Sequence, residues 1–259
     1  MPSRMRGASP GAFIGWVVLL TVIVVSLDDV APSYSQLIDG VPSMMSLLDR
    51  MIPPNTEGAF LNRVFWQIIE TFQSALVGSA IGIALSLPIA WLASRGISPL
   101  GHFSFLAKAF VSLLRTVPDL VWALLFVSAV GLGAVAGTLT IIVDTIGFCG
   151  RFFAEAMEDS EEDPRQALSA IGAGRMSVLV GAIIPDAAPS MVNSSLFALE
   201  KAVRSSVVLG LVGAGGIGQE LKVAFDLFQY PSAMTIILVI FVIVLAMEFV
   251  TDYLRRKIS

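Results

Sequence analysis

The chain has 259 residues, of which 56% are apolar and 14% are charged, and its mean hydropathy is +0.83. Soluble globular proteins carry roughly a quarter charged residues, so this composition indicates an integral membrane protein. One cysteine and one histidine supply neither a disulfide framework nor a cluster of metal ligands. The net charge of −4 is the opposite of the basic face that nucleic-acid binding needs. We therefore expect no metal, no cofactor and no nucleic-acid partner.

The first apolar stretch, residues 11–27, contains no charge and follows Arg4 and Arg6. No small-x-small cleavage site follows it cleanly, so the stretch indicates an uncleaved signal anchor rather than a cleaved signal peptide. Residues 28–64 contain several prolines and apolar residues at helical spacing, which predicts a helix lying along the membrane interface. We expect residues 1–64 to form this anchor and a periplasmic interfacial segment, and residues 65–259 to form the membrane core.

Further apolar stretches are long enough to cross about 30 Å of hydrocarbon at about 1.5 Å per helical residue. In chain order they are residues 74–93, 105–130, 134–153, 187–211 and 233–250. Residues 176–185 are too short to cross, so the fifth span is expected after them. The sequence thus predicts an all-α integral membrane protein with about six transmembrane helices. Lysine and arginine are retained on the cytoplasmic side, and their distribution predicts that both termini are cytoplasmic.

A glycine-rich motif, GAGGIG at residues 213–218, fits the GxGxxG pattern of dinucleotide-binding sites. That fingerprint needs a preceding strand in a βαβ unit, whereas an apolar span precedes it here. The motif instead predicts a sharp backbone break or a close helix approach where backbone lines a cavity. The pairs Gly78/Gly82 and Gly133/Gly137 are predicted to be small-residue faces that let helices pack tightly.

The sequence contains no GxxxxGK[ST] motif and no GxSxG or HExxH motif. The chain is therefore not expected to bind a nucleoside triphosphate or to catalyse hydrolysis by itself. An energy source, if there is one, is expected on another subunit.

Charged residues within or near the predicted spans are costly unless they pair or face water, so some are expected to line a solute path. They are Glu70, Arg115, Asp119, Asp144, Glu200, Lys201 and Arg204. Arg204 would suit an anionic solute, although Glu200 lies four residues earlier and a mutual ion pair is the alternative. Pro118 is expected to break the helix between Arg115 and Asp119, at the cytoplasmic end of the third span. A cap and a gate both remain open for that break.

A polar block at residues 155–175 contains six acids, which a solvated loop would explain. Within it, Pro164 followed by residues 165–172, RQALSAIG, predicts a short surface helix that starts at a proline and ends at a glycine. A helix of this kind is suited to docking on a partner protein.

The spacing in this block resembles the cytoplasmic EAA loop of ABC-importer permeases. Gln166-Ala167-Leu168 is followed after three residues by Gly172, and after nine more by Ala182-x-Ile184-Pro185. The family pattern has Glu at position 166 and Ile at position 182. The resemblance implies that the helix is a coupling helix that inserts into a cleft of an ATP-binding subunit. It assigns ATPase coupling to Gln166, Ala167, Leu168, Gly172 and Pro185.

A wider resemblance, over most of residues 70–256, is to phosphonate-uptake permeases. It is carried by residues 114–125, 131–133, 151–156, 203–204 and 208–218. It implies a bacterial inner-membrane permease that moves a phosphonate or related small oxyanion by alternating access. The implied partners are a second copy of the chain, two ATP-binding cassette subunits and a periplasmic substrate-binding protein.

The candidate pathway residues combine the charged positions with the glycine motif. They are Arg204, Glu200, Glu70, Arg115, Asp119, Gly213, Gly215, Gly216 and Gly218. Permeases for methionine or phosphate share part of the pattern, so the solute stays open. A different class of function, an autonomous ion-coupled carrier or channel that uses the buried acids, is the second hypothesis.

Overall fold

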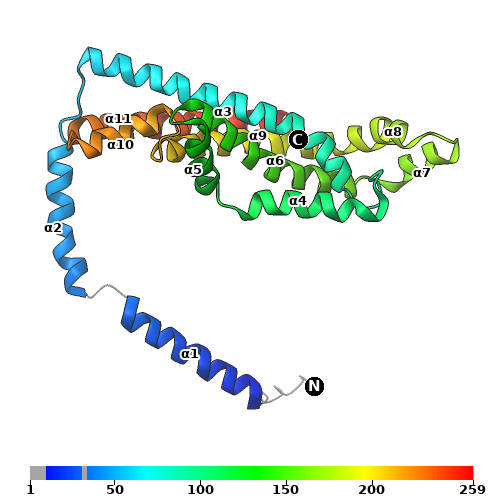
Figure 1. Cartoon of the computed structure of the whole chain (residues 1–259), viewed down its shortest axis with the longest axis horizontal. Coiled ribbons are helices and arrows are strands. Elements are labelled where there is room, and N and C mark those ends of the chain that lie inside the picture. The colour runs from blue at the N-terminus through cyan, green and yellow to red at the C-terminus, as the bar shows by residue number, and fades with distance from the viewer. Residues whose placement is uncertain (1–9, 31–33, 259) are drawn as a thin grey trace. The chain divides into compact units, whose positions relative to one another are not determined.

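The computed structural model describes residues 10–30 and 34–258, and every regular element in them is a helix (Figure 1). The predicted all-α class is therefore confirmed. The chain divides into two compact units, Met1–Arg50 and Met51–Ser259. Met51 and Phe60 belong to the second unit, where they pack with Ile217 and Ala233 in one buried cluster.

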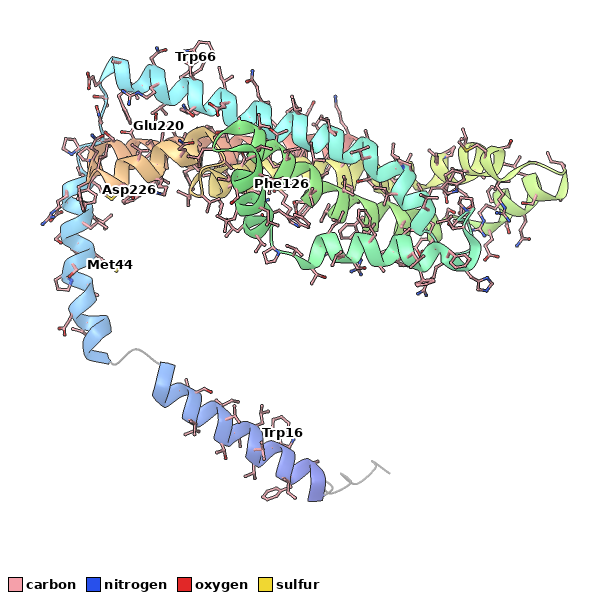
Figure 2. The ribbon with its side chains drawn as sticks, in the orientation of Figure 1. Trp16, Met44, Trp66, Phe126, Glu220 and Asp226 are labelled. Atoms are coloured by element: carbon pink, nitrogen blue, oxygen red, sulfur yellow. The ribbon has the colours of Figure 1, made fainter. Side chains whose placement is uncertain are left out.

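The first unit contains α1 (Pro10–Val30) and all of α2 (Tyr34–Met51) except its last residue. The helix predicted after the anchor is present, and several of its apolar side chains, such as the labelled Met44 in Figure 2, are exposed. Its location at a membrane interface stays a prediction, as does the assignment of residues 1–64 as a signal anchor and periplasmic segment. Arg4 and Arg6 lie outside the described residues.

The second unit is a helical bundle. Its elements are α3 (Gly58–Ala93), η1 (Gly101–Phe103), α4 (Ser104–Thr116), α5 (Asp119–Val130), α6 (Ala134–Glu158), α7 (Glu162–Ala170), α8 (Arg175–Val178), η2 (Leu179–Ile183), α9 (Ile184–Gly210), α10 (Gly216–Asp226) and α11 (Tyr230–Ile258). Many apolar side chains of the bundle face outward, including Trp66, which is 61% exposed (Figure 2). Such a surface suits a lipid environment rather than water.

Four continuous helical stretches are long and apolar enough to span a membrane: Gly58–Ala93, Ala134–Glu158, Arg175–Gly210 and Tyr230–Lys257. A fifth span is obtained if α4 and α5, which are bent by 86°, count as one. The shorter apolar stretch Gly11–Leu27 would be the sixth. The predicted number of about six therefore needs both the bent pair and α1.

The break at Pro118 is real, but it does not lie at the end of a span as expected. It separates α4 from α5 midway along the predicted third span, and α5 alone has 12 residues, or about 18 Å, too short to cross. The backbone there packs against the middle of α6, because a Cβ built on Gly147 would lie 3.2 Å from the nitrogen of Arg115. Proline explains the break, since it cannot donate to the helix and disfavours helical backbone at Val117.

The fifth predicted span starts earlier than expected. Helical backbone runs without interruption from Arg175 to Gly210, through the residues judged too short to cross. The stretch passes Pro185 because η2 is a π turn at Leu179–Ile183, directly before it. A π turn changes the hydrogen-bond register, which accommodates the missing proline donor.

The small-residue prediction is confirmed for Gly78 and Gly82. Both face α6, and a Cβ on Gly78 would lie 2.8 Å from the side chain of Ile141. The second pair differs from the prediction. Gly133 caps the start of α6 rather than lying on its face, while Gly137 packs against a loop, where a Cβ would lie 2.6 Å from the carbonyl oxygen of Ala214.

Candidate functional site

The predicted docking helix is α7, and the residues around it form a hairpin with α8. We call Glu161–Val178 the coupling hairpin. The Asp186 carboxylate accepts a hydrogen bond from the main-chain nitrogen of Glu161 at 2.8 Å, which ties the start of α7 to α9. At the other end of α7, Leu168 packs on Gly181, where a Cβ would lie 3.3 Å from its Cδ1. The hairpin is therefore held at two points, by Asp186 of α9 and by Gly181 of the π turn that precedes it.

The turn of the coupling hairpin depends on Gly172. Its φ of +81° lies in the left-handed region that favours glycine. Next to it, the main-chain nitrogen of Ala173 donates to the carbonyl oxygen of Leu168 at 3.1 Å, which closes the last turn of α7. Ile171 is 79% exposed beside this turn. An apolar side chain on such a tip fits a surface that another protein covers.

The five coupling residues predicted from sequence are found on or beside this hairpin. Gln166 and Ala167 are exposed on α7, and the Gln166 amide donates to the carboxylate of Glu162 at 3.2 Å. Pro185 follows the π turn at the start of α9. Leu168 and Gly172 hold the hairpin rather than extending from it. Gln166, which stands where the family pattern has Glu, thus contacts Glu162 of its own helix.

The charged residues of α9 form a cluster with α11. Glu200, whose side chain is 11% exposed, forms ion pairs with Arg204 on its own helix and with Arg255 at 3.0 Å. Its carboxylate also accepts from the Thr251 hydroxyl at 3.2 Å. The ion pair between Glu200 and Arg204 is therefore present. Arg255 also pairs with Asp252 at 3.6 Å, so two arginines face two acids in this cluster. Arg204 is its more exposed arginine, with 51% of the side chain exposed.

Two further charged residues of the list, Asp119 and Arg115, make separate contacts. Asp119 starts α5 and accepts a hydrogen bond from the Ser205 hydroxyl at 3.2 Å, which joins α5 to α9. Arg115 stacks its guanidinium over the ring of Phe152 on α6, 5.5 Å from the centroid. Asp144 and Lys201, also placed within the spans by sequence, form an ion pair at 2.7 Å.

Glu70 lies elsewhere, at the glycine-rich loop. Its carboxylate accepts from the main-chain nitrogen of Gly216 at 3.3 Å, and the neighbouring Thr71 hydroxyl accepts from the nitrogen of Ile217 at 2.8 Å. These are donors of the first turn of α10, which are otherwise unsatisfied. Glu70 and Thr71 therefore cap α10 from α3, and a carboxylate there also complements the helix dipole.

The glycine-rich loop is a tight connection between α9 and α10, not a nucleotide site of a βαβ unit. Gly213, Gly215 and Gly216 have positive φ. A Cβ on Gly215 would lie 2.6 Å from the nitrogen of Ala134, and one on Gly210 would lie 2.7 Å from the Cα of Gly218. The sharp break and close approach expected from sequence are confirmed.

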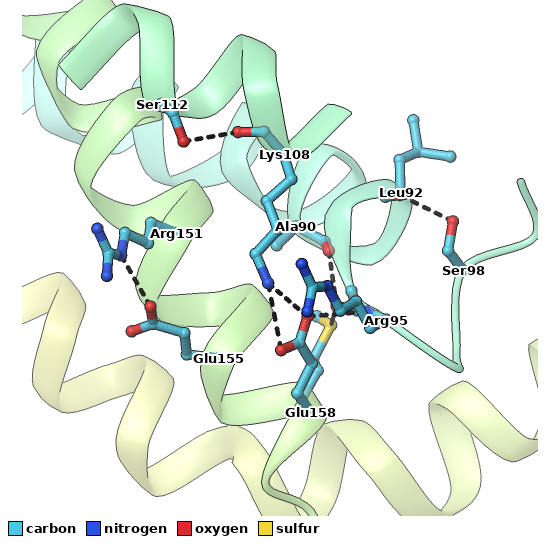
Figure 3. Close-up of polar contacts among 11 residues, drawn as sticks. Ala90, Leu92, Arg95, Ser98, Lys108, Ser112, Arg151, Glu155 and Glu158 are labelled. Atoms are coloured by element: carbon cyan, nitrogen blue, oxygen red, sulfur yellow. Dashed lines mark hydrogen bonds and ion pairs between the residues drawn. The ribbon is translucent and has the colours of Figure 1, made fainter. Parts of the chain in front are cut away.

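A polar network ties the other end of the bundle together (Figure 3). The carboxylate of Glu158, at the end of α6, forms an ion pair with Lys108 of α4 at 3.0 Å and accepts from the main-chain nitrogen of Arg95 at 2.8 Å. Sequence reasoning missed this contact and the roles of Thr71, Asp186 and Arg255. Each joins residues at least 25 positions apart, for which a single sequence carries no pairing signal.

Comparison with known proteins identifies the family to which the chain belongs. Residues 82–259 match the family described as binding-protein-dependent transport system inner membrane component. The chain belongs to this family. It is thus the permease component of an ABC importer, in the inner membrane, and the resemblance noted from the EAA spacing is confirmed.

Two relatives are similar to this permease in sequence. The phosphite transport system permease protein PtxC of Stutzerimonas stutzeri is 35% identical over 245 residues, which cover 95% of this chain and 87% of that protein. The phosphate-import permease protein PhnE of Mycolicibacterium smegmatis is 36% identical over 214 residues, 83% of this chain. The match covers only 40% of the length of PhnE.

A solved structure shows the same fold. A chain of the inward-facing MetNI methionine ABC transporter matches with a TM-score of 0.66 and 23% identity, over 79% of this permease and 100% of that chain. At this identity the likeness concerns the fold alone. It shows that this chain shares the fold of an ABC-importer permease.

Proposed function

We propose that the permease translocates a phosphonate, phosphite or phosphate-like oxyanion by alternating access, driven by a partner ATPase. The observation that carries the solute class is the 35% identity to a phosphite permease over nearly the whole chain. The exposed side chain of Arg204 supports it, because a fixed cation near the path favours an anionic solute.

The coupling hairpin is proposed as the element that receives the ATPase stroke. Its exposed tip offers Ile171 to a partner, while Asp186 and Leu168 tie it to α9. α9 also carries Glu200, Lys201 and Arg204, so a displacement of the hairpin would be carried along one helix to the charged cluster. Gln166 and Ala167 are proposed to contact the ATPase directly.

The pathway residues fall into two proposed roles. Arg204, Arg115 and Asp119 lie at or beside the break between α4 and α5 and on the facing part of α9, where a bent pair leaves backbone to line a cavity. Glu200 holds Arg204 in place. Glu70 and the glycines 213, 215, 216 and 218 are proposed to border the path at the α9–α10 turn, where Glu70 holds the loop.

The assembly is proposed to contain two copies of this chain, two ATP-binding cassette subunits and one periplasmic substrate-binding protein. Both termini are proposed to face the cytoplasm, on the same side as the coupling hairpin. The distribution of lysine and arginine supports this orientation.

Uptake by cells tests the solute class. A strain that depends on this importer should accumulate radiolabelled phosphite, phosphate or methylphosphonate, and unlabelled oxyanion should compete whereas methionine should not. Competition by methionine alone would contradict the proposed solute class while leaving the importer architecture intact.

A further inference from the structure

A cleft of about 640 Å³ lies beside the coupling hairpin. One wall is formed by residues 95–105, which connect α3 to α4, and the other by α7, α8 and the π turn. Four basic side chains line it: Arg95, His102, Arg165 and Arg175. No aspartate or glutamate is among the described residues that line it.

The arginines of this cleft are not neutralised by the protein. Among residues 10–30 and 34–258, Arg95, Arg165 and Arg175 form no ion pair, whereas six other basic residues do. Arg175 instead donates to the carbonyl oxygen of Pro99 at 3.3 Å, which joins the two walls. Glu158, which contacts the segment after α3, is already used by Lys108 and does not line the cleft.

The lining of this cleft carries basic side chains without any acid among its described residues. Retention of basic residues on the cytoplasmic side explains why arginines lie at this end of the bundle. It does not explain why the acids of residues 155–163, which are close in sequence, are absent from the lining. Three guanidinium groups around an open polar space are suited to a small, doubly charged oxyanion, because guanidinium forms paired hydrogen bonds with phosphate oxygens.

We propose that this cleft binds a phosphate or phosphonate group. Two sources of that group can reach it: the headgroup of an anionic phospholipid of the inner leaflet, or a free oxyanion in the cytoplasm. Exposed Phe103 and Phe105 lie on the same wall segment and suit the acyl chains of a lipid. A free oxyanion would make the cleft a sensor of solute on the releasing side. The proposed orientation decides only which sources reach the cleft, not whether it binds them.

The test measures binding to the purified, intact permease complex, without transport. Binding of inorganic phosphate is followed by equilibrium dialysis, and retention of phosphatidylglycerol by native mass spectrometry. The test variant is Arg95→Gln with Arg165→Gln, and the control is Arg151→Gln, whose side chain pairs with Glu155 outside the cleft. Loss of charge-assisted hydrogen bonds should weaken binding at least about tenfold in the test variant only.

The two readouts separate the sources. Weaker phosphate binding in the test variant identifies a free oxyanion, and loss of retained phosphatidylglycerol identifies a headgroup. Unchanged values in both readouts would overturn the proposal. The proposal would also be overturned if the unaltered protein binds neither ligand and the test variant loses the ATPase from the complex. That outcome would assign the arginines to protein docking. Because no solute is transported in these assays, the result is independent of the proposed solute class.

Discussion

Asp186, the residue after Pro185, accepts a hydrogen bond from the main-chain nitrogen of Glu161, which precedes the first residue of α7. The bond joins the surface helix that would meet an ATPase to the long helix that carries the charged cluster. A displacement of α7 would therefore reach α9 through a hydrogen bond as well as through the connecting chain.

Asp186→Ala should uncouple the importer. Removal of the acceptor leaves the start of α7 untied, so ATP hydrolysis should continue while solute uptake falls several-fold. Asp186→Asn keeps a side-chain oxygen that can accept the same bond, and it should retain most of the uptake. The measurement is the ratio of uptake to ATP hydrolysed in reconstituted vesicles. An unchanged ratio in Asp186→Ala would show that this contact does not transmit the stroke.

Gly172→Ala should disturb the coupling hairpin through backbone strain. Left-handed backbone costs a non-glycine residue about 1–2 kcal/mol, and Gly172 has φ of +81°. Gly174 is the matched control, since its φ is −69° and both glycines have open space around a Cβ. Uptake should fall in Gly172→Ala and stay normal in Gly174→Ala, with equal amounts of protein in the membrane. Equal uptake in the two variants would refute the role of the turn.

Arg204→Ala should abolish uptake without loss of folded protein. Glu200 keeps Arg255 and Thr251 as partners in this variant, so the cluster loses its exposed cation but leaves no buried charge unpaired. Lys222→Ala is the control, because Lys222 is also 51% exposed and also pairs with an acid four residues away. Normal uptake by Arg204→Ala would remove Arg204 from the proposed anion path.

Thr71→Val should destabilise the permease, because it removes the acceptor for the main-chain nitrogen of Ile217 at nearly constant volume. Loss of a helix cap costs about 0.5–2 kcal/mol. Thr71→Ser keeps the hydroxyl and should be close to the unaltered protein. Thermal unfolding in detergent measures the difference. If Val and Ser unfold at the same temperature, α10 does not depend on this cap.

Much of the membrane core could be predicted from sequence, because hydrophobic stretches and proline breaks are local signals. The surface helix was predicted for the same reason, since Pro164 lies in the first turn of α7 and Gly172 follows shortly after its last residue, Ala170. The start of the fifth span was wrong because a π turn lets the helix pass Pro185, and nothing in the residue pattern announces that turn.

The candidate site was less accessible to sequence. The spacing of Glu200 and Arg204 predicted their ion pair, but Arg255 joins it from a helix 55 positions away. Its charge places Glu70 among the predicted pathway residues, whereas in the structure its carboxylate caps the start of α10. The basic cleft had no signature at all, since Arg95, Arg165 and Arg175 come from three separate segments.

Purification of the tagged chain from native membranes in mild detergent tests the central claim most directly. An ATP-binding cassette subunit should co-purify in stoichiometric amount, and its ATP hydrolysis should rise when the substrate-binding protein and phosphite or methylphosphonate are added together. A folded preparation without any ATPase, under conditions that preserve a known importer complex, would contradict the account.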